Sequence, residues 1–292
     1  MTTVDVLVPF YGDAALLREA VTSVLAQDDP NWRLTVVDDG GAEDVRPWFA
    51  TVDDERVRYL RNPRNLGLTG NFNRCLDLVE LDLAVLMGCD DRMLPNYVRT
   101  VRAAHAADPE AGIIQPGVRV IGPDGRPART LVDEVKRRIY APRGRVTLGG
   151  EDLAVSLLRG DWLYFPSLAW RADVLTSVRF RRDLRVIQDL ALLMELVLRG
   201  VRLVVDDTPC FEYRRHGASE SSATAFDGSR FTEAGEFFAA TADRLTRHGW
   251  PRAARVARRH VSSRIFALTM LPRAVRQGAG MRALVRHALG RR

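Results

Sequence analysis

The sequence predicts an α/β protein with a mainly parallel, Rossmann-like sheet covered by helices on both faces. Short β-branched apolar runs alternate with amphipathic segments through the first 121 residues, which is typical of βαβ units. Polar turn-forming clusters follow each of four apolar runs. The chain has 292 residues, of which 46% are hydrophobic, so it can bury a large core.

The first half contributes most of the predicted sheet. Residues 4–10 (VDVLVPF) form a buried strand with Pro9 near its end, and Asp13 is placed to cap a helix over 14–26. In chain order we then expect a strand over 33–37, a short helix over 43–51, a strand over 57–60, a helix over 69–79, a strand over 83–87, a helix over 95–107 and a strand over 112–121.

The second half is less regular. Residues 122–150 are rich in Gly, Pro and Arg and predict a loop or hairpin. Beyond them we expect a helix over 151–159, a strand over 163–170, a short helix over 172–177, a helix over 188–199, strands over 201–205 and 210–213, and a loop over 218–228. Two or three basic helices should follow between 229 and 289, with breaks near 249–251 and at Pro272. These features predict a domain over 1–228, with halves 1–121 and 122–228, and a helical extension over 229–292.

Charge is distributed unevenly along the chain. The net charge is +6, yet residues 244–292 contain thirteen arginines and no acidic residue, so the remainder carries 30 basic and 37 acidic residues. Such asymmetry points to a polyanion near the tail, either a membrane surface or a nucleic acid. The alternatives are a solvated helical face and a contact between copies of the chain. Val261, Ile265, Leu268 and Leu271 recur at helical spacing among arginines, which is the pattern of a helix lying on an anionic membrane or of one packed on the body.

Several classes of protein are disfavoured. The three cysteines form no CxxC pair, so a disulfide scaffold and a structural zinc site are not expected. No apolar run is long enough to cross a bilayer, and the first residues do not resemble a secretory signal. The expected compartment is the cytoplasm, with a peripheral position at the inner face of the plasma membrane as a further option. No GxGxxG follows the first strand and no GxxxxGK[ST] occurs, which argues against a dinucleotide site and a P-loop.

Four polar clusters lie where the predicted parallel strands end, at 11–13, 38–39, 61–67 and 89–91. Ligands of open α/β sheets bind outside the carboxyl ends of the strands, so these clusters predict one binding rim. Tyr11 offers a ring that can stack on a nucleobase, and carboxylates can bind ribose hydroxyls or a divalent cation. The rim therefore suits a nucleotide diphosphate held through a metal ion.

Six segments in this order resemble family 2 glycosyltransferases, which have the GT-A fold. They are VLVPFYGDAALLREAVTSVLAQ, LTVVDDGG, NPRNLGLTGNFNRCLD, VLMGCDDRMLP, VIQDLALLMELVLRG and YRRHGASESS. The resemblance runs from about residue 4 to residue 219 and leaves the extension outside. It implies a GT-A domain whose first half binds a nucleotide sugar and whose second half binds the acceptor.

The resemblance also implies roles for residues of the nucleotide side. Tyr11 and Asp39 occupy positions that hold the nucleobase, although Asp39 could instead form an Asx turn with the glycines that follow it. The other expected nucleotide-binding residues are Pro9, Asp13, Asp38, Arg64, Gly67 and Asn71. Open alternatives are a helix cap for Asp13, a structural role for Asp38, a surface arginine at 64, and packing for Asn71. Gly67 is expected to shape its loop by adopting a positive φ.

The implied cofactor is a divalent metal, Mn²⁺ or Mg²⁺. Asp90 matches the second aspartate of the family's DxD motif, and Asp91 is the alternative ligand. Gly88 replaces the first aspartate, as in a GxDD variant of the motif, which leaves the ribose contact open. His216 matches a family position near the diphosphate and the metal.

Asp189 is the expected catalytic base, because an inverting transfer needs one group to take the proton of the acceptor hydroxyl. An aspartate in a first helical turn could alternatively serve the helix dipole. Arg214 and Arg215 are expected to steady the leaving diphosphate. Asp161 and Trp162 are expected on the acceptor side, with core packing as the alternative for Trp162.

The predicted function is an inverting transfer of sugar from a UDP- or dTDP-sugar to an acceptor hydroxyl. The acceptor would be a carbohydrate, a lipid-linked molecule or a small molecule, in cell-envelope polysaccharide or natural-product synthesis. A nucleotidyltransferase and a non-catalytic nucleotide-sugar-binding protein are the alternatives. We expect no nucleic-acid partner, because the rim is acidic, while membrane contact or self-association through the C-terminal helices stays open.

Overall fold

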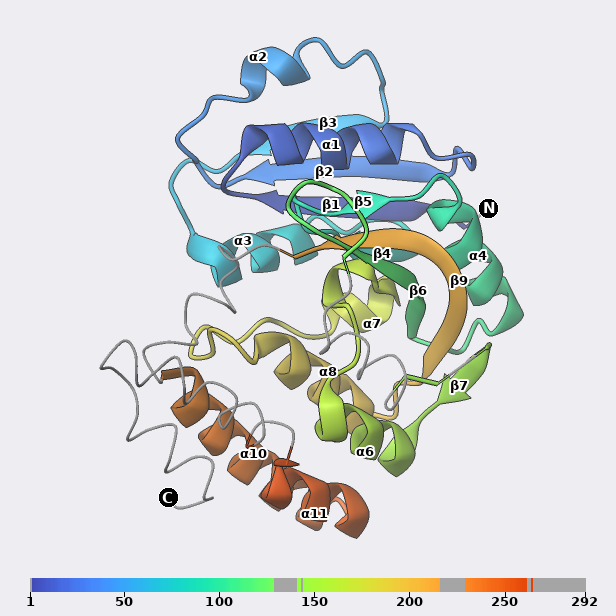
Figure 1. The fold of residues 1–292 in the computed structure, drawn as a ribbon, viewed down its shortest axis with the longest axis vertical. Coiled ribbons are helices and arrows are strands. Elements are labelled where there is room, and N and C mark those ends of the chain that lie inside the picture. The colour runs from blue at the N-terminus through green and yellow to red at the C-terminus, as the bar shows by residue number, and fades with distance from the viewer. Residues whose placement is uncertain (1, 129–140, 143, 216–228, 262–263, 265–292) are drawn as a thin grey trace.

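The computed structural model describes residues 2–128, 141–142, 144–215, 229–261 and 264. The described residues form one nine-stranded mixed sheet in the order β3-β2-β1-β4-β8-β6-β9-β5, with β7 paired to β9 (Figure 1). The strands are β1 (Val4–Phe10), β2 (Trp32–Asp38), β3 (Val57–Arg61), β4 (Leu83–Leu86), β5 (Arg92–Met93), β6 (Ile113–Ile121), β7 (Val146–Leu148), β8 (Ala169–Arg171) and β9 (Leu203–Arg214).

Helices cover both faces of this sheet. They are α1 (Ala14–Leu25), α2 (Arg46–Phe49), α3 (Gly67–Leu76), α4 (Tyr97–Ala107), α6 (Gly150–Gly160), α7 (Ala172–Thr176), α8 (Gln188–Leu198), α10 (Ser229–Arg247) and α11 (Pro251–Arg259). Alternate residues of β1 belong to two separate apolar cores: Val6 and Val8 pack with α1 and α4, whereas Leu7 packs with α3, α6 and α8. The fold prediction of a mainly parallel α/β sheet covered on both faces is therefore confirmed.

Strands β3, β2, β1 and β4 are mutually parallel, so their carboxyl ends meet at one edge of the sheet. Strand β8 runs antiparallel to both β4 and β6, and β9 runs parallel to β6. Consequently β6 and β9 also end at the edge where β1 and β4 end. The polar residues after all six strands are brought to the same side of the molecule.

The strands depart from the sequence prediction in three respects. The strand expected over 163–170 is wrong in its first part, because Pro166 lies in a 3₁₀ turn (Phe165–Ser167) and β8 begins at Ala169. The two strands expected over 201–205 and 210–213 are one continuous strand, β9, with a register shift beside Gly117. A Cβ at Gly117 would lie 2.4 Å from the Asp207 carbonyl oxygen, so a glycine permits this close approach. The two short strands β5 and β7, which pair with β9, were not predicted.

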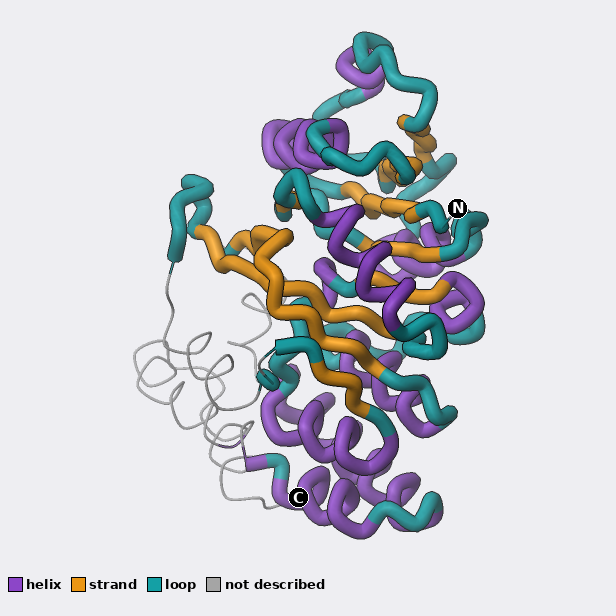
Figure 2. Tube along the Cα trace, turned by 90° about the vertical axis from the view of Figure 1, so that its right-hand side faces the viewer, coloured by secondary structure: helices purple, strands orange, loops and turns teal. Residues whose placement is uncertain are grey.

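The helices α10 and α11 share a hydrophobic core with α6 and α8. Phe238 of α10, Leu245 of α10 and Ala253 of α11 are buried in the same cluster as residues of α6 and α8. In Figure 2 the strands run through the middle of the molecule with helices on either side, and the helices at the lower end are those that Figure 1 labels α6, α8, α10 and α11. The core is thus continuous across the boundary predicted at 228/229.

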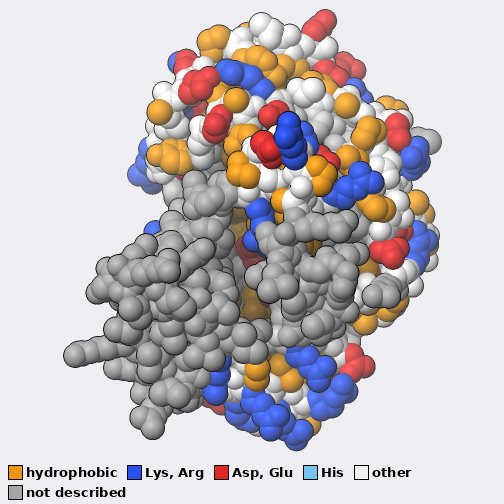
Figure 3. Space-filling model, in the orientation of Figure 1, with side chains coloured by type: hydrophobic (Ala, Val, Ile, Leu, Met, Phe, Trp, Pro, Cys, Tyr) orange, Lys and Arg blue, Asp and Glu red, His pale blue; other side chains and the backbone are white. Residues whose placement is uncertain are grey.

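The predicted amphipathic run falls mostly outside the described residues, where Ile265, Leu268 and Leu271 lie. Within the described residues, α11 buries its alanines and exposes Arg252, Arg255, Arg258 and Arg259. Figure 3 shows arginine side chains gathered at this end of the molecule. None of the described helices is long and apolar enough to span a membrane.

Candidate active site

A buried polar network around Asp39 holds the part of the rim that follows β2. One carboxylate oxygen of Asp39 accepts hydrogen bonds from the Asn62 side chain (2.8 Å) and from the Leu66 backbone N–H (2.8 Å). Asn62 also donates to the side-chain oxygen of Asn71 (3.0 Å), which itself donates to the Val37 carbonyl (2.9 Å). The network fixes the loop after β3 against the end of β2. Asn71 is buried and has a packing role in this structure.

The Asx turn at the end of β2 is formed by Asp38 rather than Asp39. One Asp38 oxygen accepts from the Gly40 backbone N–H (2.8 Å), and the other accepts a short hydrogen bond from the Tyr59 hydroxyl. Burial, together with this carboxylate, raises the pKa of Tyr59 well above its usual value. Asp38 is fully buried, which gives it a structural role in this turn.

The remaining nucleotide-side residues line the open part of the rim. Tyr11 is 63% exposed, so its ring is free to receive a planar ligand. Asp13 caps α1, accepting from Ala15 N (2.7 Å) and Leu16 N (3.3 Å), as the capping alternative predicts. Gly67 has φ +71° at the start of α3, which confirms its predicted conformation. Arg64 is exposed, and Pro9 lies within β1 opposite Val37 of β2.

The carboxylates of Asp90 and Asp91 converge beside Gly88. A Cβ at position 88 would lie 2.5 Å from an Asp91 oxygen and 2.9 Å from an Asp90 oxygen. Because a glycine replaces the first aspartate of the DxD pattern, these two carboxylates can occupy the space beside position 88. Asp91 is buried, and burial and the neighbouring Asp90 charge raise its pKa well above its usual value.

This convergence fits a divalent cation, because Mg²⁺ and Mn²⁺ prefer hard oxygen donors and a cation would relieve the repulsion between the acids. Within the described part of the chain, no three His, Cys, Asp or Glu residues are grouped as a complete metal site. His216, the third predicted ligand, lies outside the described residues. Asp90 and Asp91 are thus the described residues that could hold a metal.

Arg214 supports the structure of the site and is not open to a ligand. Its guanidinium is buried and donates to the Asp90 carbonyl (2.7 Å), the Pro123 carbonyl (3.0 Å) and Glu19 of α1 (2.6 Å). Its backbone N–H also donates to Asp91 (2.8 Å). The structure therefore contradicts the diphosphate contact expected for Arg214. Its guanidinium is enclosed by these partners and holds in place the loop that carries Asp90 and Asp91. Arg215 is half-buried, and its guanidinium lies over the Tyr213 ring, 5.6 Å from the ring centroid. Of the two arginines, Arg215 is therefore better placed to contact a diphosphate.

Asp189 lies in the first turn of α8 and is half-buried there. Burial and the neighbouring carboxylate of Asp161 raise the pKa of Asp189 to about 7. Asp161 is the C-cap residue of α6, so the start of α8 faces the end of α6. Gln188 accepts a hydrogen bond from Thr69 of α3 (3.1 Å), which ties this helix to the nucleotide side. A carboxyl with a pKa near neutrality suits a general base.

Tyr213 connects the two acidic groups of the site. Burial raises the pKa of its phenol to about 12, and the carboxylates of Asp91, Asp90 and Asp189 contribute to the rise. Asp90 and Asp189 therefore act electrostatically on the same hydroxyl, although 99 positions separate them in the sequence. The Tyr164 ring packs on Tyr213, with centroids 5.2 Å apart. Asp91, Asp90 and Asp189 thus all contribute to the raised pKa of one phenol.

The structure contradicts the acceptor role expected for Trp162. Its ring is buried among the residues of the α6 and α8 core, and its indole N–H donates to Ser156 (3.0 Å). The packing alternative therefore holds for Trp162, because no ring face is open to a sugar. Asp161, by contrast, stays half-buried beside Asp189.

Sequence reasoning missed two residues of this site, Asn62 and Tyr213. Both lie inside segments that carried the family resemblance, at the start of NPRNLGLTGNFNRCLD and of YRRHGASESS. A signal was therefore present in their positions. Their roles depend on partners from distant segments, Asp39 for Asn62 and the acids for Tyr213.

Comparisons with known proteins identify the family and the fold. The model of the family described as "Glycosyl transferase family 2" matches residues 5–156. An uncharacterized protein of Mycobacterium tuberculosis is 27% identical over 222 residues, covering 74% of this chain and 68% of that protein. The Rhizobium meliloti succinoglycan biosynthesis protein ExoO is 26% identical over 228 residues, covering 77% of this chain and 64% of its own length.

A Campylobacter jejuni relative is named GalNAc(5)-diNAcBac-PP-undecaprenol beta-1,3-glucosyltransferase. It is 28% identical over 104 residues, which is 35% of this chain and 34% of that enzyme. Among solved structures, Staphylococcus aureus TarS 1–349 in complex with UDP-GlcNAc matches with a TM-score of 0.69 at 16% identity, covering 98% of this chain and 82% of that one. This structural likeness establishes the shared GT-A architecture.

Proposed function

Because the chain belongs to glycosyl transferase family 2 and is a glycosyltransferase, we propose that it transfers a sugar from a UDP- or dTDP-sugar to an acceptor hydroxyl with inversion. The observation that carries the proposal is the convergence of the Asp90 and Asp91 carboxylates beside Gly88, together with the Thr69–Gln188 hydrogen bond that ties the first turn of α8, where Asp189 lies, to α3. One acid pair suited to a cation-bridged diphosphate and one separate base are the two groups that an inverting transfer requires.

The nucleotide is proposed to bind across the ends of β1 and β2. The exposed Tyr11 ring would stack on the base, and Asp39, fixed by Asn62 and Leu66, would face it. Arg64 and Arg215 are proposed to offset diphosphate charge from opposite sides of the rim. Arg214 is not included, because its guanidinium is enclosed by Glu19 and two backbone carbonyls.

A divalent cation held by Asp90, with Asp91 and His216 as further proposed ligands, would act as a Lewis acid that neutralises charge on the departing diphosphate. Within the protein, Arg214 keeps this acidic loop in place through the Asp90 carbonyl and the Asp91 carboxylate. The loop is therefore preorganised before the nucleotide arrives.

Asp189 is proposed to take the proton of the acceptor hydroxyl as that oxygen attacks the anomeric carbon. Its raised pKa, about 7, makes the carboxylate a stronger base than an ordinary aspartate while leaving it largely ionised at slightly alkaline pH. Asp161 helps to raise this pKa and borders the space in which an acceptor would sit.

The acceptor is proposed to be lipid-linked, in synthesis of a cell-envelope polysaccharide or glycolipid. Two lines of support are the undecaprenol-linked substrate in the name of the Campylobacter relative and the exposed arginines of α11. An anionic surface would attract such a basic face.

Flotation with anionic vesicles tests the proposed membrane contact. Vesicle binding at low salt should be abolished when glutamine replaces Arg252, Arg255, Arg258 and Arg259. Unchanged binding would contradict the proposed membrane contact.

The test of the transfer itself combines donor binding and chemistry. UDP, dTDP and GDP with Mn²⁺ are compared by thermal shift, and hydrolysis of the matching nucleotide sugar is then followed with Mn²⁺ or EDTA. We expect EDTA to remove activity and Asp189→Asn to remove it while retaining nucleotide binding. Binding of the nucleotide with no turnover on any sugar or acceptor would instead favour a non-catalytic nucleotide-sugar-binding protein.

A further inference from the structure

We propose that Glu233, on helix α10, is a positioning residue that holds the catalytic helix α8 from outside the family match. The inference rests on the proposed function, because it concerns the aspartate that would act as base. Glu233 belongs to the basic extension that starts at 229, beyond the segments that resemble the family. Its carboxylate contacts the backbone immediately before Asp189.

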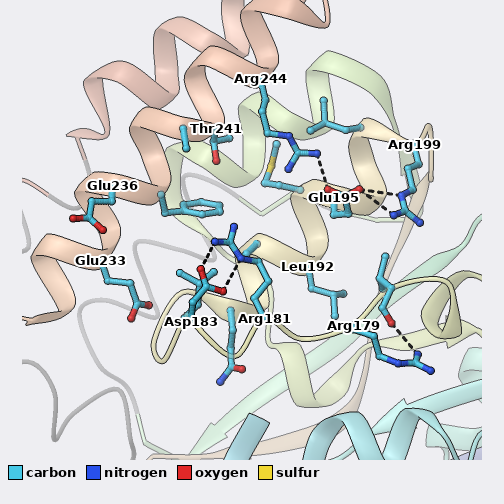
Figure 4. A pocket seen from close by; sticks show the side chains of 18 of the residues that line it. Arg179, Arg181, Asp183, Leu192, Glu195, Arg199, Glu233, Glu236, Thr241 and Arg244 are labelled. Atoms are coloured by element: carbon cyan, nitrogen blue, oxygen red, sulfur yellow. Dashed lines mark hydrogen bonds and ion pairs between the residues drawn. The ribbon is translucent and has the colours of Figure 1, made fainter. Parts of the chain in front are cut away.

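Glu233 accepts three backbone hydrogen bonds from consecutive residues. One oxygen accepts from Val186 N and Ile187 N, both at 2.9 Å, and the other accepts from Arg185 N at 2.9 Å. Figure 4 shows Glu233 pointing from α10 toward the chain that leads into α8. Hydrogen bonds to a charged acceptor are stronger than neutral ones, so this carboxylate holds the turn firmly.

Helix α8 lacks a cap of its own. Its N-cap residue is Ile187, whose side chain cannot accept a hydrogen bond, and Asp189 follows two residues later. Unpaired N–H groups before a helix must find acceptors. Glu233 supplies one carboxylate for this purpose, and thereby fixes the position from which Asp189 projects.

Helix α10 is itself held against α8 at a second point. Arg244 pairs with Glu195 of α8 at 2.6 Å, and Phe237 packs between the two contacts in the shared core. Figure 4 shows Glu233 and Arg244 at separate positions along α10. A helix attached at two points is a rigid support, so the turn before Asp189 is fixed relative to the whole domain.

The test compares Glu233→Gln with Glu236→Gln in the full chain. Glu236 is exposed on the same helix and serves as the matched control. The glutamine at 233 puts an N–H₂ group where one acceptor oxygen was, so at least one backbone N–H loses its partner. We expect kcat to fall about ten- to hundredfold, the loss expected when a reacting group moves by about 1 Å. UDP affinity should stay within about twofold of wild type, because the nucleotide contacts are remote from α10.

Two further readouts separate positioning from general structure. The acidic limb of the kcat profile should move to lower pH in Glu233→Gln, since a loosened turn at 185–187 would expose Asp189 to more water and lower its pKa. Amide exchange of residues 185–190 should quicken in Glu233→Gln and not in Glu236→Gln. The milder Glu233→Asp, which keeps the charge on a shorter side chain, should give intermediate effects and covers the case in which the glutamine variant does not fold.

The outcomes distinguish this inference from the proposed function. Equal kcat and equal exchange in Glu233→Gln and Glu236→Gln would overturn the positioning role, as would a parallel loss of UDP affinity and kcat. If the wild type transfers no sugar and Asp189→Asn changes nothing, the proposed function fails. The exchange measurement still decides whether Glu233 holds the turn in that case.

Discussion

At the scale of residues, the rim shows how surroundings assign different tasks to the same side chain. Asp38 accepts a hydrogen bond from its own turn, and Asp39 accepts hydrogen bonds from the loop after β3, so both shape the rim. Asp90 stays half-buried beside the enclosed Asp91, whereas Asp189 is half-buried and has its pKa raised by burial and by Asp161. Solvation and neighbouring charge, rather than residue type, therefore distinguish these aspartates.

The pH dependence of transfer follows from Asp189. Its pKa is raised to about 7, and a base must be deprotonated, so activity should rise as pH increases through about 7. At a pH two units below that pKa, about 1% of the base is ionised, and the rate should be about a hundredfold below its plateau. Initial rates at saturating donor between pH 5 and 9 measure this. A flat profile down to pH 5 would contradict Asp189 as the base.

A side chain at position 88 is predicted to displace the Asp90 and Asp91 carboxylates. A Cβ there would lie 2.5 Å from an Asp91 oxygen, so Gly88→Ala must displace the carboxylates that converge on this point. We expect loss of Mn²⁺-dependent stabilisation by UDP and at least a tenfold fall in activity, about 1.4 kcal/mol of transition-state stabilisation. Thermal shift with UDP, with and without Mn²⁺, is the measurement. Wild-type Mn²⁺ dependence in the variant would show that the acidic pair is not the cation site.

At the scale of elements, two carboxylates cap helices that belong to other parts of the chain. Glu151 of α6 accepts from the backbone N–H groups of Arg252 (2.6 Å) and Ala253 (3.1 Å) at the start of α11. Glu233 of α10 accepts from the backbone N–H groups of Val186 and Ile187, just before the first turn of α8. Each of these carboxylates joins α6 or α8 to one of the two C-terminal helices.

Removing the α11 cap should destabilise the fold measurably. Glu151→Ala deprives two N–H groups of their acceptor, and caps of this kind contribute about 1 kcal/mol. Denaturant unfolding should report that loss. The control is Asp152→Ala, which removes the exposed ion pair with Arg252 (2.8 Å), a contact expected to contribute about 0–1 kcal/mol. A larger loss in the control than in Glu151→Ala would contradict the capping role.

At the scale of the whole molecule, the C-terminal helices complete the core of the domain. Leu245 of α10 is fully buried in the cluster that contains residues of α6 and α8. A chain ending at 228 would expose that cluster to water. The family-matched region and the helical pair therefore depend on each other for stability.

The dependence predicts a large effect of a single truncation in α10. Leu245→Ala should lower the free energy of unfolding by about 2–5 kcal/mol, the range for a buried leucine replaced by alanine. Chemical denaturation should show one cooperative transition with a lower midpoint. Removal of residues 229–292 should leave a chain that does not fold cooperatively. A separate, unaffected transition for residues 1–228 would mean that the predicted boundary divides two independent domains.

The sequence by itself determined the alternation of strands and helices, the edge at which the polar clusters meet, and Asp13 as the cap of α1, because periodicity and capping are local properties. Predictions from local sequence failed where residues distant in the sequence determine the structure. Strand β9 stays extended through Pro209 because β6 pairs along it, and Trp162 is enclosed by α6 and α8. Three further features arise between segments that are remote in the sequence. They are the burial of Arg214, the effect of both Asp90 and Asp189 on the pKa of Tyr213, and the hydrogen bonds that Glu233 accepts from the turn before α8. Tertiary structure alone settles these, since burial and charge proximity depend on the folded arrangement.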